Sequence, residues 1–266
     1  MSISWQSRKL HVIPFVPHSC KSRGTNPSRL NAVIHKDAPW LLLPLAPLML
    51  LQAIAVKRRA QRLPPARGCE GRCGEGSVLW RLVGLGDSTI AGIGVTDHTQ
   101  SVVGRTAAQM HAARGETIEW QARGFSGLKL QDVCTRLAPS APPAEIYLVS
   151  AGVNDAVAGT APEAFANDLQ ALAARLRERA PGCRIVFAGI PPLASFPALP
   201  WPLSAYLDRR GRALQAAARS VAVRANEIAC HDFPARLEAG DFASDGFHPG
   251  PSGCDAWARE LVTLLT

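Results

Sequence analysis

Short apolar runs alternate with longer amphipathic stretches from about residue 79 to the end of the chain. Five runs have the length and composition of strands, at residues 78–86, 117–123, 145–152, 183–190 and 226–233. Helical periodicity fills the intervals, at residues 101–115, 128–137, 162–180, 203–224 and 251–265. Gly115 and the pair Pro181 and Gly182 are stop signals, and Ser252 is the expected cap of the last helix. Strands interleaved with helices form a parallel sheet covered on both faces, so the pattern predicts an α/β fold with about five parallel strands.

The chain before residue 79 follows a different pattern. Residues 1–38 lack helical or strand periodicity and are expected to be a disordered N-terminal extension, whereas residues 39–56 form an uncharged apolar run. As a helix this run would extend roughly 27 Å, slightly short of a bilayer core, and we expect a membrane-associated segment. Residues 57–78 are basic and rich in Pro and Gly, which predicts a linker to a single domain at 79–266.

The side of the membrane is less clear from the sequence. Lys57, Arg58 and Arg59 follow the apolar run and favour a cytoplasmic location for what comes after it. The small residues at 53–55 resemble a cleavage site, so export with a cleaved signal is the alternative. The sequence does not decide the oligomeric state.

The net charge of +8 is confined to the N-terminal part of the chain. Residues 1–78 hold 12 Lys and Arg against 3 Asp and Glu, while residues 79–266 hold 17 against 18. The main domain is nearly neutral, which argues against nucleic acid as a partner. The seven cysteines are scattered, and Cys69 and Cys73 have no second pair of ligands at zinc spacing. We therefore expect neither a metal nor a disulfide framework.

Polar motifs follow the predicted strands, where ligands bind in parallel α/β sheets. They are "GDST" (86–89), "RGFSG" (123–127), "GVND" (152–155) and "DGFHP" (245–249). Ser88 is a candidate nucleophile, His248 a candidate base, and Asp245 a carboxylate that would orient the imidazole. The backbone N–H groups of Ser88 and Gly127 and the side-chain amide of Asn154 would stabilise an oxyanion. Glycine at 127 suits a backbone that approaches the substrate closely.

These four motifs, in this order, resemble the signature blocks of the SGNH hydrolases, also called the GDSL esterase/lipase family, over about residues 80–265. The resemblance implies a flavodoxin-like α/β/α sandwich and a serine hydrolase without metal or other cofactor, acting on carboxylic or acetyl esters. It also implies the roles given above for Ser88, Gly127, Asn154, Asp245 and His248. Asp87 and Asp155 are expected to orient loops. Two departures from the family pattern are Thr89, where leucine is usual, and Ala122–Arg123, where asparagine is common.

Other functions remain open at this stage. "GLGDST" lacks the third glycine of a dinucleotide site, which disfavours a nucleotide cofactor. A membrane-anchored binding protein that kept the fold and lost turnover is the alternative from another functional class. Among enzymes, esterase, lysophospholipase, acetylesterase and thioesterase activities are all compatible with the motifs. We expect residues 191–206, with Phe196 and Trp201, to line an acyl pocket, and His98 and His111 to face solvent.

Overall fold

The computed structural model describes residues 44–225, 228–233 and 237–265, which contain six strands and seven α-helices. The strands are β1 (Glu70–Cys73), β2 (Trp80–Gly86), β3 (Ile118–Gly124), β4 (Ile146–Ser150), β5 (Arg184–Phe187) and β6 (Ile228–Cys230). The helices are α2 (Ala46–Arg59), α3 (Val102–Arg114), α4 (Leu130–Asp132), α5 (Val153–Ala158), α6 (Pro162–Arg179), α7 (Leu203–Ala225) and α8 (Pro251–Thr263). All five predicted strands are present, and only β1 and α5 lack a predicted counterpart.

The strands form one sheet in the order β1-β3-β2-β4-β5-β6. The strands from β2 to β6 pair in parallel, whereas β1 joins the edge of β3 in the antiparallel sense. Numbered among themselves, the five parallel strands have the flavodoxin-like order 2-1-3-4-5, which confirms the predicted fold class. The order reverses beside β2, between β3 on one side and β4 on the other. Ligands bind at such a reversal, beyond the carboxyl ends of the strands.

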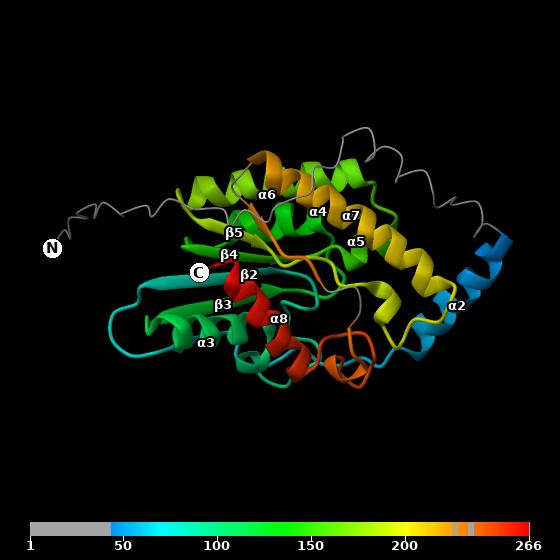
Figure 1. The fold of residues 1–266 in the computed structure, drawn as a ribbon, viewed down its shortest axis with the longest axis horizontal. Helices are drawn as coiled ribbons and strands as arrows, with labels where there is room; N and C mark the ends of the chain where they lie inside the picture. The colour runs from blue at the N-terminus through cyan, green and yellow to red at the C-terminus, as the bar shows by residue number, and fades with distance from the viewer. Residues whose placement is uncertain (1–43, 226–227, 234–236, 266) are drawn as a thin grey trace, which may run out of the picture. The chain divides into compact units, whose positions relative to one another are not determined.

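Alternate residues of the central strands face two separate cores. Val83, Tyr147 and Ile185 pack with α6 and α7 on one face of the sheet. Leu82, Ile146 and Val186 pack with α3 and α8 on the other. Figure 1 shows these two helical layers on opposite sides of the sheet. Strands buried on both faces read as continuous apolar runs, which is why the sequence pattern identified them.

The stretch before the main domain differs from its prediction. Residues 57–59 end the helix α2, and residues 70–73 form the edge strand β1, so the predicted linker at 57–78 is wrong in these two places. The tetrapeptide Glu-Gly-Arg-Cys has neither the length nor the composition of a strand, and pairing with β3 alone defines it. The predictions for residues 1–38, and the first part of the apolar run at 39–56, fall outside the described residues. Within the described chain, every helix is too short or too polar to cross a bilayer.

The helix ends follow local sequence signals with one exception. Gly115 ends α3 in the left-handed conformation at φ 68°, as its position after the helical pattern predicts. The prediction for Ser252 is wrong, because α8 begins at Pro251 with Gly250 as its N-cap. The Ser252 hydroxyl instead donates a 2.6 Å hydrogen bond to the carbonyl of Gly240, which connects the first turn of α8 to the preceding loop.

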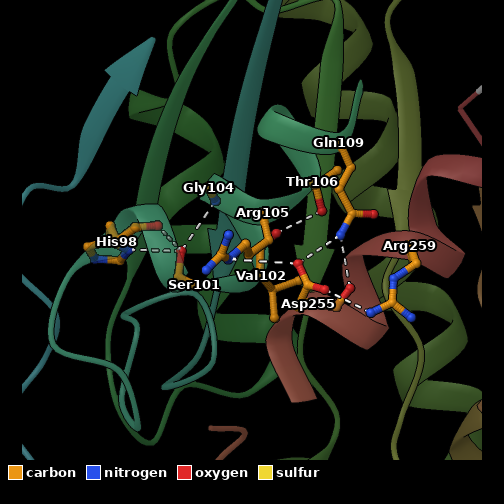
Figure 2. Close-up of polar contacts among 9 residues, drawn as sticks. All are labelled: His98, Ser101, Val102, Gly104, Arg105, Thr106, Gln109, Asp255 and Arg259. Carbon is orange, nitrogen blue, oxygen red and sulfur yellow. Dashed lines mark hydrogen bonds and ion pairs between the residues drawn. The ribbon is translucent and has the colours of Figure 1, made fainter. Parts of the chain in front are cut away.

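A polar cluster joins α8 to α3 (Figure 2). Asp255 of α8 accepts a hydrogen bond from Gln109 of α3 at 3.1 Å and lies 3.8 Å from the Arg105 guanidinium. Arg259, one turn further along α8, donates to the same carboxylate at 2.8 Å. Because α8 begins three residues after His248, this cluster fixes the helix that follows the "DGFHP" motif.

Candidate active site

Ser88 lies at the centre of the sheet, two residues past the end of β2. Gly86 ends that strand so close to β4 that a Cβ there would stand 2.1 Å from the carbonyl oxygen of Ser150. Only glycine permits this approach. The N–H of Asp87 then donates to the same carbonyl at 3.1 Å, and the chain turns away from the sheet. Ser88 is therefore held at the point where the strand order reverses.

The "DGFHP" motif forms a tight turn that brings His248 to Ser88. The Nε2 atom of His248 lies 2.9 Å from Ser88 Oγ, although the two residues are 160 positions apart. The Nδ1 atom lies 2.6 Å from Asp245 Oδ2. The other oxygen, Oδ1, accepts the backbone N–H groups of Phe247 and His248 at 3.0 Å each. These two bonds lock the carboxylate and aim its free oxygen at the imidazole.

The environment keeps Asp245 ionised. Burial of the carboxyl raises its pKa, but hydrogen bonds from the His248 ring and from two backbone N–H groups outweigh burial, so the pKa lies below its ordinary value. A charged carboxylate against Nδ1 favours the tautomer with a proton on that nitrogen. The lone pair of Nε2 is then directed at the Ser88 hydroxyl.

Asn154 and Gly127 lie on two neighbouring loops that contact each other. The Asn154 side-chain amide donates to the carbonyl of Leu128 at 3.0 Å, so the loop after β4 supports the loop after β3. Gly127 has φ +85°, a left-handed conformation that favours glycine over other residues. An added Cβ would have no neighbour within 4 Å, so crowding by the protein is not the reason. Asn154 lines the cavity beside Ser88, whereas Gly127 is not among the described residues that do so.

The two aspartates predicted to orient loops are both buried. Asp87 accepts a hydrogen bond from the N–H of Thr89 at 3.0 Å, and burial raises its pKa to about 7. Asp155 accepts the N–H of Leu130 at 3.1 Å and the hydroxyl of Thr160 at 3.1 Å. Burial also raises the pKa of Asp155, against these hydrogen bonds. Asp155 thus connects α5 to the start of α4.

A cavity of about 170 Å³ opens beside Ser88 and His248. Three phenylalanines from two loops form one wall: Phe196 packs edge-on against Phe242 and Phe247, with ring centroids 5.1 Å apart in both pairs. Phe196 lies in the cavity wall as the sequence predicts. Trp201 does not, because its side chain is 69% exposed on the surface and is not part of the lining.

The cavity lining includes a second imidazole, His231, that the sequence analysis missed. His231 follows β6 directly, and its Nε2 lies 2.9 Å from Glu260 Oε2 of α8. Its Nδ1 lies 3.1 Å from the carbonyl of Ala188, and Phe233 packs edge-on against its ring. A signal was available, since His231 stands just after an apolar run, as Ser88 does. The strand is only three residues long, and its loop matches no motif.

The structure also shows the surroundings of His98 and His111, the two other histidines considered in the sequence analysis. The prediction that His98 faces solvent is wrong, because it is 3% exposed and its Nδ1 lies 3.3 Å from the hydroxyl of Ser101. Burial lowers the pKa of His98. His111 is partly buried, with Nδ1 2.8 Å from the carbonyl of Glu116. Both are structural and lie outside the cavity. Among the residues that the structure describes, no three His, Cys, Asp or Glu side chains are grouped to hold a metal ion.

Comparisons with known proteins identify the family and the fold of the chain. Residues 85–256 match the model of a family described as the GDSL-like Lipase/Acylhydrolase family. The fold is similar to that of the crystal structure of TesA, with 21% identity, 70% of this chain and 98% of that chain covered, and a TM-score of 0.55. The lipase Lip_vut3 from a goat rumen metagenome is also similar, with 17% identity, 69% and 96% coverage, and a TM-score of 0.54. A variant of Axe2, an acetyl xylan esterase from Geobacillus stearothermophilus, has 16% identity, 71% and 95% coverage, and a TM-score of 0.52. No curated protein matches the sequence.

Proposed function

Because the chain belongs to the GDSL-like lipase/acylhydrolase family and is an ester hydrolase of that type, we propose that it cleaves carboxylic esters through an acyl-enzyme on Ser88. The observation that carries the proposal is the row of three side chains Ser88, His248 and Asp245, joined at 2.9 Å and 2.6 Å. A hydroxyl becomes a useful nucleophile only when a base stands ready to take its proton.

Acylation begins when Ser88 Oγ attacks the ester carbonyl carbon and its proton passes to His248 Nε2. The carbonyl π electrons move to the oxygen, which becomes an oxyanion. When the tetrahedral intermediate collapses, the bond to the alcohol oxygen breaks and that oxygen takes the proton from Nε2. Water then attacks the acyl-enzyme with His248 as base, and the carboxylic acid leaves as Ser88 regains its proton. Asp245 stays ionised throughout and stabilises the imidazolium.

The oxyanion needs donors that converge beside Ser88. We assign this role to the backbone N–H groups of Ser88 and Gly127 and to the Asn154 amide. The Asn154 amide has two hydrogens, and the bond to Leu128 uses one of them, so the other is available to the substrate. The same bond fixes the rotamer of Asn154, which favours stabilisation of the transition state because the donor is already oriented.

The substrate class follows from the wall of the cavity. Phe196, Phe242 and Phe247 offer an apolar surface next to His248, which suits the acyl chain of the ester. We propose acyl esters with a chain of several carbons as substrates, in preference to acetyl esters. A series of p-nitrophenyl esters of increasing chain length tests this, with Phe196→Ala expected to shift the optimum to longer chains. An optimum at acetate that Phe196→Ala leaves unchanged would contradict the assignment, and thioester substrates of equal chain length test the alternative leaving group.

The experiment that tests the mechanism uses a fluorophosphonate probe, which labels an activated serine. The wild-type chain should be labelled and should hydrolyse p-nitrophenyl esters, and Ser88→Ala should lose both. Ser220→Ala is the matched control, because Ser220 lies on α7 and hydrogen-bonds within its own helix. A folded wild-type chain that neither reacts with the probe nor turns over esters would favour a binding protein that has lost catalysis.

A further inference from the structure

Helix α2 exposes an uninterrupted apolar surface. The helix has no fully buried residue, although Met49 and Val56 rest against the core formed by α6 and α7. Leu50 and Leu51 are 64% and 65% exposed. Trp201 is 69% exposed, and its backbone carbonyl accepts a hydrogen bond from Gln52 of α2. We call the following set the α2 face: Leu48, Leu50, Leu51, Ile54 and Trp201. Soluble surfaces rarely gather this many large apolar side chains in one place.

Positive charge borders the α2 face on one side. Lys57, Arg58, Arg59 and Arg62 follow the apolar turns and are all exposed. The sequence contains no acidic residue between Asp37 and Glu70 that could neutralise them. Exposed apolar side chains next to a basic cluster match an anionic lipid surface, which offers hydrocarbon below a layer of phosphates. Tryptophan is enriched at such interfaces.

Hydrogen bonds connect α2 to the segment that leads to the cavity wall. The Gln52 side chain donates to the carbonyl of Trp201 at 2.8 Å and accepts the N–H of Leu203 at 3.2 Å, so it holds the chain on both sides of Pro202. Five residues before Trp201, Phe196 lies in the cavity wall. Between them, the N–H of Ala198 donates to the carbonyl of Gly246, inside the "DGFHP" turn, at 3.0 Å.

The chain that leaves α2 reaches the same turn from another direction. Gln61 accepts a hydrogen bond from the hydroxyl of Ser244, the neighbour of Asp245, at 3.2 Å. Both segments that border the α2 face therefore contact the loop that carries His248. The segments on either side of the α2 face are therefore connected to the loop that lines the cavity.

We propose that the α2 face, together with the basic cluster at 57–62, docks the protein on an anionic phospholipid bilayer and brings the cavity to it. The participation of Trp201, 149 positions after Gln52 in the chain, distinguishes this surface from a simple apolar segment. If the apolar run alone anchored the protein, membrane binding would not depend on Trp201. If the folded α2 face docks on the membrane, binding also depends on Trp201.

Vesicle flotation tests the proposal with the full chain carrying Ser88→Ala, so binding is measured without turnover. Vesicles of phosphatidylcholine alone are compared with vesicles that also contain phosphatidylglycerol. We expect binding to the anionic vesicles, and a several-fold weaker partition for Trp201→Ala. Val223→Ala is the matched control, because Val223 is 82% exposed near the opposite end of α7. Substitution of Lys57, Arg58 and Arg59 by Ala should lower binding by about 100-fold at low salt, from about fivefold for each charge.

Three outcomes would overturn the proposal. The first is binding that Trp201→Ala and Val223→Ala leave equally unchanged, which would mean that the apolar run anchors the chain alone. The second is equal binding to neutral and anionic vesicles. The third is self-association through the α2 face without vesicle binding, measured as a change of mass in Leu50→Ser/Leu51→Ser by light scattering.

A second readout connects the surface to turnover and rests on the proposed function. In the active chain, Trp201→Ala should leave kcat/KM on a soluble p-nitrophenyl ester unchanged and lower the rate on a lysophospholipid presented in anionic vesicles. If the soluble ester is not cleaved by the wild-type chain, the proposed function fails while the binding result still stands. If vesicle binding fails while the soluble ester is cleaved, only the docking surface is wrong.

Discussion

Two histidines, His231 and His248, line the same cavity, and each is paired with a carboxylate. The two pairs differ in the group that the second ring nitrogen faces. His248 and Asp245 lie 2.6 Å apart, and His231 and Glu260 lie 2.9 Å apart. In each pair one ring nitrogen faces a carboxylate. The remaining nitrogen of His248 faces the Ser88 hydroxyl, whereas that of His231 faces the carbonyl of Ala188. Both nitrogens of His231 therefore face acceptors, and neither is directed at a hydroxyl.

The two carboxylates, Asp245 and Glu260, differ in burial and in how firmly they are held. The Asp245 side chain is 4% exposed and is fixed by two backbone N–H groups, while the Glu260 side chain is 55% exposed on the rim of α8. A fixed, buried carboxylate orients a ring and stabilises its charged form, whereas an exposed one contributes less because water screens it. We therefore assign catalysis to His248 and packing of the cavity wall to His231.

The variants with the largest expected effect on kcat replace each imidazole by an amide. We expect His248→Gln to lower kcat on the order of 10⁶-fold, because the serine loses its base. His231→Gln should change kcat by less than about tenfold, since its ring does not touch the reacting atoms. Steady-state kinetics on a p-nitrophenyl ester, with circular dichroism to confirm folding, measures both. Comparable losses in the two variants would end the distinction.

The carboxylates give the next largest difference. Asp245→Asn should lower kcat by about 10⁴-fold, because the amide stabilises the wrong tautomer of His248 and cannot balance the imidazolium. Glu260→Gln should leave kcat nearly unchanged. The fluorophosphonate labelling rate offers an independent measurement, and it should fall in Asp245→Asn alone.

Substitution of His231 should lower the free energy of unfolding more than substitution of His248, which is the reverse of their expected effects on kcat. The buried ring of His231 makes two hydrogen bonds and an aromatic contact to Phe233, so His231→Ala should cost about 3 kcal/mol of the free energy of unfolding. His248→Ala should cost about 1 kcal/mol, because Asp245 keeps its two backbone donors. Urea unfolding measures both values. A larger loss in His248→Ala would contradict the structural role of His231.

Asp87 is another buried carboxyl, and it lines the same cavity. It accepts a hydrogen bond from the backbone N–H of Thr89 and is not paired with an imidazole. Burial raises its pKa to about 7, whereas the unfolded chain releases this proton near pH 4. Between these values the folded state binds more protons, so the free energy of unfolding falls as pH rises, by up to about 1.4 kcal/mol per pH unit.

Asn at position 87 has no proton to lose and should remove this contribution. The stability of Asp87→Asn relative to wild type should therefore increase from about pH 4 to about pH 7 and then level off. Urea unfolding at a series of pH values measures the difference between the two proteins, in which the other titrating groups cancel. A difference that stays constant with pH would show that the carboxyl is already ionised in the folded state.

Much of the fold could be predicted because most of its strands and helices are specified by the pattern of apolar residues within each segment. The β4 strand is buried at all five positions, and its apolar run identified it without any partner. The Glu70–Cys73 strand could not be identified in this way, since only its pairing with β3 makes it a strand. The helix α5 was missed for a similar reason: its six residues are too few for a periodic pattern, and the "GVND" motif drew attention as a loop.

The chemical types of the site residues could likewise be chosen from four short motifs, because a serine, an imidazole and a carboxylate have fixed reactivity wherever they stand. Their contact at 2.9 Å, across 160 positions, depends on the parallel sheet that carries each motif to the same edge. The environment of His231, the burial of His98 and the surface position of Trp201 likewise come from distant segments. The sequence by itself determined which groups this protein can use and which elements carry them, because both are properties of short stretches of chain. Only the tertiary structure decided which imidazole faces a hydroxyl and which faces a carbonyl, since hydrogen-bond partners and exclusion from water are set by packing.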